Sequence, residues 1–395
     1  MKTIISGILL TAALGVAMAD EPRKEDTDID AMHADFSALA GGSYEPAAYS
    51  SFTPVAAEGY RYENLVTGSS SFRRMRRGIL VVGDGDTIRA MEPFKTTAGA
   101  ERRYASVVNE YARRLGDSVR VYCMPVPTAV AFYCPDGARG YTSASRPAME
   151  KIFAGLDESV VPVDIFPTLG THAAEPIYSR TDHHWAPLGA YYAAACFASD
   201  ADVPFASLES YAEQCVEGYV GTMKKFSADP RVGQAPETFT YYTPLDSCYE
   251  VTYRIYSLDK TRRNVTSQTE PRNGKLFQNF TGSATYLTFL GGDSRLTEIS
   301  TNVGNGRRLL ILKDSFGNAI PGYLTGSFDK IHVVDCRYFT DNIISYMKRN
   351  GITDVLFVNN LTHAVNPRTT ETYLRYLEQE DICTEATTSE TGSES

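Results

Sequence analysis

The chain has 395 residues, of which 43% are hydrophobic and 22% are charged, as in ordinary globular proteins. This length suffices for one large domain or two small ones. The formal net charge of −10 argues against nucleic acid or an anionic membrane as the main partner.

The first 19 residues have the pattern of a cleavable signal peptide. Lys2 gives a positive start, residues 4–16 are apolar, and Ala17-Met18-Ala19 fits the small-x-small cleavage site. The run is short for a membrane anchor, although an uncleaved anchor or a buried helix is the alternative. We therefore expect an exported protein, periplasmic or secreted, with no membrane anchor after signal cleavage.

Between a polar lead-in at 20–59 and a disordered tail at 384–395, residues 60–383 alternate strand-like and helical patterns, as α/β domains do. Residues 205–300 are rich in Tyr, Thr and Ser, which predicts a β-rich insertion packed on the main domain. The predicted strands are 79–83, 119–123, 160–165, 309–313, 331–335 and 354–358, and the predicted helices are 101–115, one beginning near 187, 340–350 and 369–380. The last three strands are continuous apolar runs, which is typical of strands covered by helices on both faces. Pro162 makes the 160–165 segment a poor central strand.

The seven cysteines are an odd number, and no pair has a metal-ligand spacing such as C-x-x-C. An oxidising compartment would permit disulfides, but the sequence leaves their pairing, and the alternative of free buried thiols, open.

Residues 178–192 hold two of the six histidines, an acid and the single tryptophan. Pro187 suits the first turn of a helix, which places Asp182, His184 and Trp185 in the preceding loop. A carboxylate beside an imidazole fixes its tautomer and stabilises the imidazolium formed in catalysis. Trp185 would shield such a site from water. A structural hydrogen-bonded loop and a metal site at Asp182, His183 and His184 are the alternatives.

Ser315 follows a buried strand, where its hydroxyl can be exposed at the carboxyl edge of the sheet and its backbone N–H can face an oxyanion. The alternative role is that of a helix N-cap. Two further strand ends carry polar residues, Arg337 on one and Asn359 and Asn360 on the other. Either asparagine could donate to an oxyanion, and Arg337 could bind an anionic or hydroxyl-rich substrate. Turn residues and a surface ion pair are the corresponding alternatives.

On these residues the chain resembles the DHHW family, named for the string at 182–185, over roughly residues 60–385. That family is similar to the SGNH-hydrolase-like acetyltransferase domains of alginate O-acetylation proteins. The resemblance implies a three-layer αβα fold around a central parallel sheet, with the SGNH segments in circularly permuted order. It also implies a triad of Ser315, His184 and Asp182, and an oxyanion asparagine at position 359 or 360. The sequence departs from the SGNH pattern at Lys313, where a glycine is usual, and at 335–337, where the second-strand glycine is absent. Asn359-Asn360 also matches only part of the Gly-x-Asn-Asp motif of the SGNH pattern.

The function implied is that of an extracytoplasmic carbohydrate O-acetyltransferase or O-acetylesterase that needs no cofactor or metal. Its substrate would be a polysaccharide or other glycan, and transfer would require an acetyl donor such as a membrane acyltransferase partner. A non-catalytic glycan-binding or envelope assembly protein on the same fold is the alternative. The enzymatic interpretation requires Ser315 Oγ to lie about 2.6–3.2 Å from an imidazole nitrogen of His184.

Overall fold

The computed structural model describes residues 72, 75–245, 249–260 and 265–380. The expected signal peptide at 1–19, the lead-in at 20–59, the tail at 384–395, and Cys248 and Cys383 lie outside the described residues. Within the described ranges, no helix has both the length and the hydropathy needed to cross a bilayer. The five described cysteines are unbridged, and all but Cys215 are buried.

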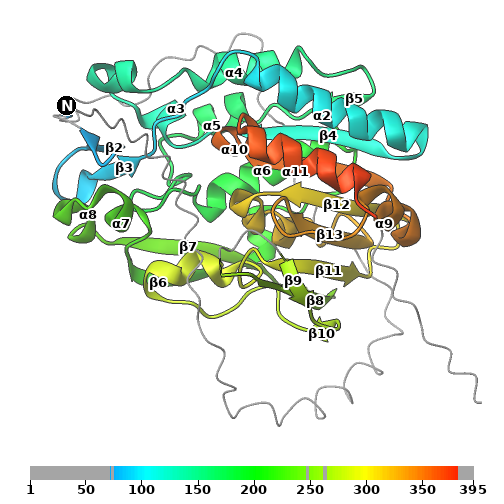
Figure 1. Cartoon of the computed structure of the whole chain (residues 1–395). Coiled ribbons are helices and arrows are strands. Elements are labelled where there is room, and N and C mark those ends of the chain that lie inside the picture. The colour runs from blue at the N-terminus through cyan, green and yellow to red at the C-terminus, as the bar shows by residue number, and fades with distance from the viewer. Residues whose placement is uncertain (1–71, 73–74, 246–248, 261–264, 381–395) are drawn as a thin grey trace, which may run out of the picture. The chain divides into compact units, whose positions relative to one another are not determined.

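A nine-stranded sheet forms the centre of the fold (Figure 1). Five of its strands are mutually parallel and adjacent in the order β13-β12-β14-β4-β5. Their bounds are β4 (Arg120–Val126), β5 (Val160–Pro162), β12 (Arg308–Lys313), β13 (Lys330–Asp335) and β14 (Asp354–Asn360). Five of the predicted strands are thus confirmed, although the one expected at 160–165 ends at Pro162, which belongs to a short edge strand where proline is tolerated.

Counted from β12, the parallel strands have the 2-1-3-4-5 order of doubly wound sheets, except that the fourth and fifth precede the others in the chain. That order is what the expected circular permutation would produce. The permutation itself stays a prediction, because it refers to an ancestral order that a single chain does not display.

The segment at 205–300 is more closely joined to the main domain than expected. Its strands β8 (Tyr249–Leu258) and β11 (Arg295–Thr301) extend the central sheet, with β11 antiparallel to β13 and β8 antiparallel to β11. The short strands β9 (Val265–Gln268) and β10 (Arg272–Asn273) pair with β8. The expected parallel sheet is therefore a mixed sheet with a parallel centre, and the insertion supplies its antiparallel edge.

Helices cover both faces of the parallel centre. Phe357 of β14 meets the rings of Tyr111 and Tyr373, which belong to two helices on one face. Tyr122 of β4 meets Phe197 of a helix on the opposite face. The longer helices are α2 (Ala100–Leu115), α4 (Ser145–Phe153), α5 (Phe166–Thr171), α6 (Pro187–Asp200), α9 (Ile343–Asn350) and α11 (Pro367–Glu378). The short ones are α3 (Val130–Tyr133), α7 (Met223–Ser227), α8 (Pro230–Gly233) and α10 (Leu361–Ala364).

Two small antiparallel sheets flank this sandwich. β1 (Met75–Arg76), β2 (Ile79–Val82) and β3 (Arg89–Met91) form one, so the predicted strand at 79–83 lies outside the central sheet. β6 (Tyr211–Tyr219) and β7 (Glu237–Pro244) form the other.

Candidate functional site

Ser315 lies where the central strand β12 ends at the carboxyl edge of the sheet. Asp314 caps the short 3-10 helix η6 (Ser315–Ala319) by accepting a hydrogen bond from the N–H of Phe316 at 2.9 Å. The second oxygen of Asp314 accepts from the backbone N–H of Asn360, the last residue of β14, at 2.7 Å. The serine is thus presented by a turn that is fastened to the neighbouring strand.

The loop before α6 brings Asp182 and His184 to the same edge. An antiparallel bridge between Tyr178 and Trp185 closes the loop, and Pro187 begins α6 as predicted. Glu237 of β7 accepts hydrogen bonds from the backbone N–H groups of Arg180 and Thr181, which fixes the loop from the insertion side.

His184 joins Ser315 and Asp182 through its two ring nitrogens. Its Nε2 lies 2.8 Å from Ser315 Oγ, and its Nδ1 lies 2.6 Å from Asp182 Oδ1. Asp182 accepts through Nδ1–H, so the lone pair of Nε2 faces the serine hydroxyl. Asp182 is 2% exposed and His184 is 6% exposed. The serine–imidazole distance lies within the range that the sequence analysis required.

Asp182 is held as an anion despite its burial. Its Oδ2 accepts from the backbone N–H and the hydroxyl of Thr222, both at 2.8 Å. Burial alone would raise the pKa of Asp182. Electrostatic interactions with the neighbouring imidazoles of His183 and His184 and the hydrogen bonds from His184 and Thr222 outweigh burial and hold the pKa of this carboxyl well below its usual range.

Two aromatic residues support the pair from outside the hydrogen-bonded line. Tyr286, in the 3-10 helix η5 (Gly282–Thr288) of the insertion, stacks on His184 with ring centroids 3.7 Å apart and planes 7° apart. Its hydroxyl donates to the carbonyl oxygens of Ser315 and Phe316, each at 3.1 Å. Trp185 is fully buried and donates from Nε1 to the same Phe316 carbonyl at 3.0 Å. Trp185 therefore holds the serine turn from inside the protein, where the sequence had suggested a shield against water.

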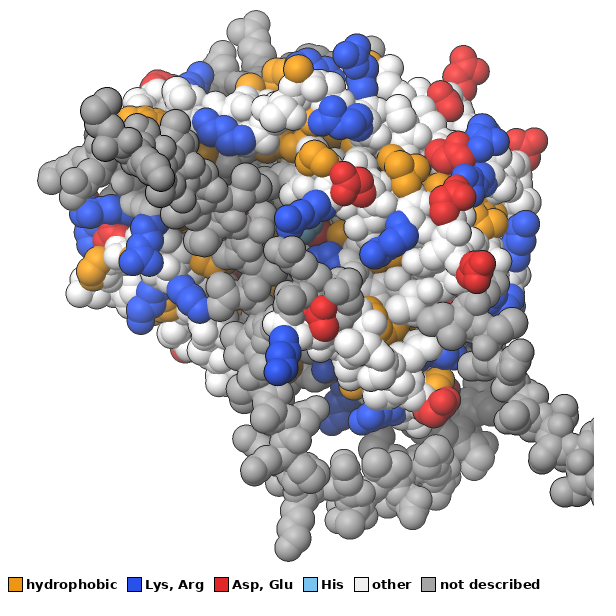
Figure 2. Space-filling model, in the orientation of Figure 1, with side chains coloured by type: hydrophobic (Ala, Val, Ile, Leu, Met, Phe, Trp, Pro, Cys, Tyr) orange, Lys and Arg blue, Asp and Glu red, His pale blue; other side chains and the backbone are white. Residues whose placement is uncertain are grey.

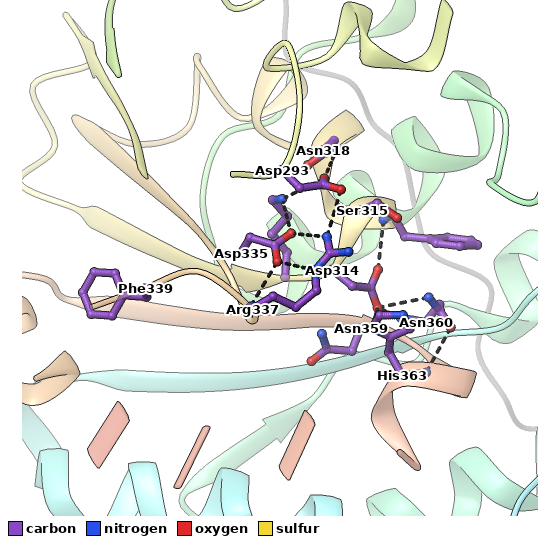
Figure 3. Close-up of polar contacts among 12 residues, drawn as sticks. Asp293, Asp314, Ser315, Asn318, Asp335, Arg337, Phe339, Asn359, Asn360 and His363 are labelled. Carbon is purple, nitrogen blue, oxygen red and sulfur yellow. Dashed lines mark hydrogen bonds and ion pairs between the residues drawn. The ribbon is translucent and has the colours of Figure 1, made fainter. Parts of the chain in front are cut away.

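The two asparagines that the sequence proposed as oxyanion donors have different surroundings. Asn359 is completely buried, and its Oδ1 accepts from the hydroxyls of Tyr104 and Tyr373 at 2.8 and 2.9 Å. Because successive side chains of a strand point to opposite faces, Asn359 points away from Ser315 (Figure 3). Asn359 is therefore not placed to donate to an oxyanion at Ser315, which corrects the expectation for this residue. Asn360 points to the serine side and donates from Nδ2 to Asp314 at 3.1 Å.

Arg337 belongs to a charged cluster beside Ser315 (Figure 3). Its guanidinium donates twice to Asp335, at 2.6 and 2.7 Å, and lies 2.9 Å from Asp293. Lys313, which stands where SGNH proteins have glycine, is buried and donates to Asp335 at 2.8 Å. Burial would lower the pKa of Lys313, but Asp335 and Asp293 raise it above its ordinary value. The side chain of Arg337 is 30% exposed, so part of it is open to solvent.

Asp182, His183 and His184 are close enough together to bind a metal ion. However, the donor atoms that face one another are already in hydrogen bonds. Both oxygens of Asp182 accept from protein donors, and His183 Nδ1 lies 2.7 Å from the hydroxyl of Thr222. A metal ion at this position would have to break the bond between His184 and Asp182.

Sequence reasoning assigned no role in the site to the supporting residues Thr222, Tyr286 and Asp314, although 221–222 and Asp314 lie in segments that carry the family resemblance. The sequence shows a glycine immediately before Thr222, and the structure explains it: a Cβ at Gly221 would stand 2.4 Å from the Cβ of Asp182. The chain therefore needs glycine there to bring Thr222 against the carboxylate. Tyr286 carried no comparable signal among 25 tyrosines.

Comparisons with known proteins agree with this architecture. The model of the DHHW protein family matches residues 66–334. A crystal structure of a DHHW family protein from Eubacterium siraeum is 38% identical, covers 76% of this chain and 96% of that chain, and has a TM-score of 0.68. PatB1 of Bacillus cereus, solved with a sulfonyl adduct, is 17% identical over 76% of this chain and 98% of its own, with a TM-score of 0.59. The O-acetyltransferase domain of Pseudomonas putida AlgJ is 12% identical over 78% of this chain and 99% of its own, with a TM-score of 0.42. No curated protein matches the sequence. The fold is of the SGNH-hydrolase-like αβα class, as expected.

Proposed function

The chain belongs to the DHHW family, and from the geometry of its site we propose that it is an exported serine enzyme, a carbohydrate O-acetyltransferase or O-acetylesterase. One observation carries the proposal. His184 lies 2.8 Å from Ser315 Oγ and 2.6 Å from Asp182, which is the arrangement that activates a serine hydroxyl. The acetyl group, the glycan and the export come from the family resemblance and the predicted signal peptide.

In the proposed first step, Ser315 Oγ attacks the carbonyl carbon of an acetyl ester while His184 Nε2 takes the hydroxyl proton. Asp182 keeps the imidazole in the required tautomer and stabilises the imidazolium. The tetrahedral intermediate collapses when the ester C–O bond breaks, and the imidazolium gives its proton to the leaving oxygen. Acetyl-Ser315 remains.

In the second step, a sugar hydroxyl or water attacks the acetyl-serine, and His184 takes and returns a proton in the same way. A sugar acceptor makes the protein a transferase, and water makes it an esterase. For transfer, a membrane acyltransferase partner is the proposed source of the acetyl group. The backbone N–H of Ser315 is the proposed oxyanion donor, with Asn360 as the candidate side chain beside it.

A fluorophosphonate probe tests the proposal, because it forms a covalent bond only with an activated serine. We expect labelling of the wild-type protein that is lost in Ser315→Ala and strongly reduced in His184→Gln. Absence of labelling in folded wild-type protein would refute the proposed enzymatic role. Retained glycan binding would then favour a non-catalytic glycan-binding or envelope assembly role.

A further inference from the structure

A cluster of exposed basic side chains lies on the surface formed by the β1–β2 turn, α7 and α8. We call this the basic patch; it consists of Arg76, Arg77, Lys224, Lys225 and Arg231. Figure 2 shows Lys and Arg side chains gathered on the left of the molecule, where Figure 1 places these elements. The net charge of −10 conceals this patch, so the overall acidity of the chain does not exclude an anionic partner at this surface.

Most of the positive charge in the basic patch is uncompensated. Within the described part of the chain, Arg77, Lys224 and Lys225 have no carboxylate at ion-pair distance. Arg76 and Arg231 share the buried Asp229, at 3.7 and 2.8 Å, and Arg231 also reaches Asp84 at 3.3 Å. Clustered like charges repel one another, so the patch is stabilised by any ligand that brings several anionic groups to it.

The basic patch is directly connected to the candidate site. α7 begins one residue after Thr222, whose N–H and hydroxyl bind Asp182. The ring of Phe226, also in α7, lies 5.6 Å from the ring of His183. Because a helix rises about 1.5 Å per residue, Lys224 and Lys225 lie within one turn of Thr222. A chain-like ligand can therefore touch the patch and the serine site together.

We propose that the basic patch is a docking surface for an anionic polysaccharide, one that carries carboxylate or phosphate groups along its chain. This rests on the proposed function, in which the site acts on a glycan. Repeated charges on a polymer match a row of separated cations better than a single small anion does. The continuity with the serine site favours a polymer substrate over a membrane surface.

The test measures binding without turnover, in Ser315→Ala protein. The probes are a polyuronate, a poly(glycerol phosphate), neutral dextran, and vesicles of phosphatidylglycerol. Lys224→Glu/Lys225→Glu reverses the charge in the patch, and Lys224→Gln/Lys225→Gln removes it without adding acid. The matched control is Lys330→Glu/Lys348→Glu, which makes the same charge change at exposed positions on the start of β13 and on α9.

We expect at least one anionic polymer to bind, and dextran to fail. The glutamate pair should weaken binding about tenfold or more, the glutamine pair less, and the control pair negligibly. Salt raised from 0.1 to 1 M should also weaken binding, because the Debye length falls from about 10 to about 3 Å. A polymer preference for carboxylate or phosphate identifies the anionic group.

Equal weakening by the control pair, unchanged binding in the glutamate pair, or binding to the vesicles alone would overturn the docking surface. Fluorophosphonate labelling of wild-type protein separates this failure from failure of the enzyme. Labelled Ser315 without polymer binding removes the docking surface only, whereas polymer binding without labelling removes the catalytic role only.

Discussion

Replacing Asp182 by asparagine removes the charge that orients His184 and leaves the size of the side chain almost unchanged. The carboxylate accepts four hydrogen bonds, two on each oxygen. Oδ1 accepts from His184 N–H at 3.1 Å and from Nδ1 at 2.6 Å, and Oδ2 accepts two at 2.8 Å from Thr222. An amide has one oxygen, so in either orientation its NH₂ group faces two donors.

The imidazole can relieve this conflict by moving its proton from Nδ1 to Nε2, which leaves no acceptor for the hydroxyl of Ser315. The wrong tautomer in an otherwise intact triad lowers kcat by about 10⁴, which corresponds to about 5.5 kcal/mol in the activation barrier. The assay is the initial rate of hydrolysis of a small acetyl ester, together with the rate of fluorophosphonate labelling.

Asp354→Asn is the matched control, because Asp354 is equally buried and hydrogen-bonded but begins β14 at the opposite edge of the sheet. It should leave the rate unchanged below its melting temperature. An Asp182→Asn variant that kept more than about a tenth of the wild-type rate would refute the orienting role.

Three further predictions concern the support of the site and its charges. Tyr286→Phe removes the hydroxyl bonded to the Ser315 carbonyl and should lower kcat about tenfold. Tyr286→Leu also removes the ring stacked on His184 and should lower kcat about tenfold more. Equal kcat values in the wild-type protein and both variants would disprove the supporting role of Tyr286. Lys313→Met removes a buried cation and leaves Arg337 alone to balance Asp335 and Asp293, so one buried negative charge is uncompensated. The change should lower the free energy of unfolding by about 3–5 kcal/mol in denaturant titrations, and an unchanged midpoint would contradict the role of the ion pair. Because the pKa of Asp182 is lowered in the folded protein, its ionised carboxylate contributes fully to the free energy of unfolding above about pH 4, the pKa of an aspartate in the unfolded chain. This contribution is lost as the pH falls below that value toward the lower pKa of the folded state. The stability gap between wild-type and Asp182→Asn protein should therefore narrow on acidification, and a gap that widened would show the opposite sign.

The parts of the fold that the sequence predicted are those with a local physical signal. Continuous apolar runs located β12, β13 and β14, because strands covered on both faces have no polar alternation. The same logic could not place β8 and β11, because a half-exposed antiparallel strand does not encode which sheet it joins. Composition predicted only a β-rich insertion in this region, whereas β8 and β11 complete the edge of the central sheet.

The site was predictable in its centre and unpredictable in its supports. Ser315 and His184 are 131 residues apart, and only the family resemblance brought them together at the sequence level. The expectation of an oxyanion donor did not hold for Asn359, because neighbouring side chains of a strand point to opposite faces of the sheet. The sequence does not say which of Asn359 and Asn360 points toward Ser315. The basic patch was visible as charge in the sequence but disappeared in the average over the whole chain.

Trapping the acetyl-enzyme tests the nucleophilic role of Ser315 most directly. The protein would be incubated with an activated acetyl ester, quenched in acid, and its peptides weighed by mass spectrometry. We predict one acetyl group on the peptide that contains Ser315, absent in Ser315→Ala and much reduced in His184→Gln. Acetylation that is equal in Ser315→Ala, or that falls on another residue of the wild-type protein, would contradict the account.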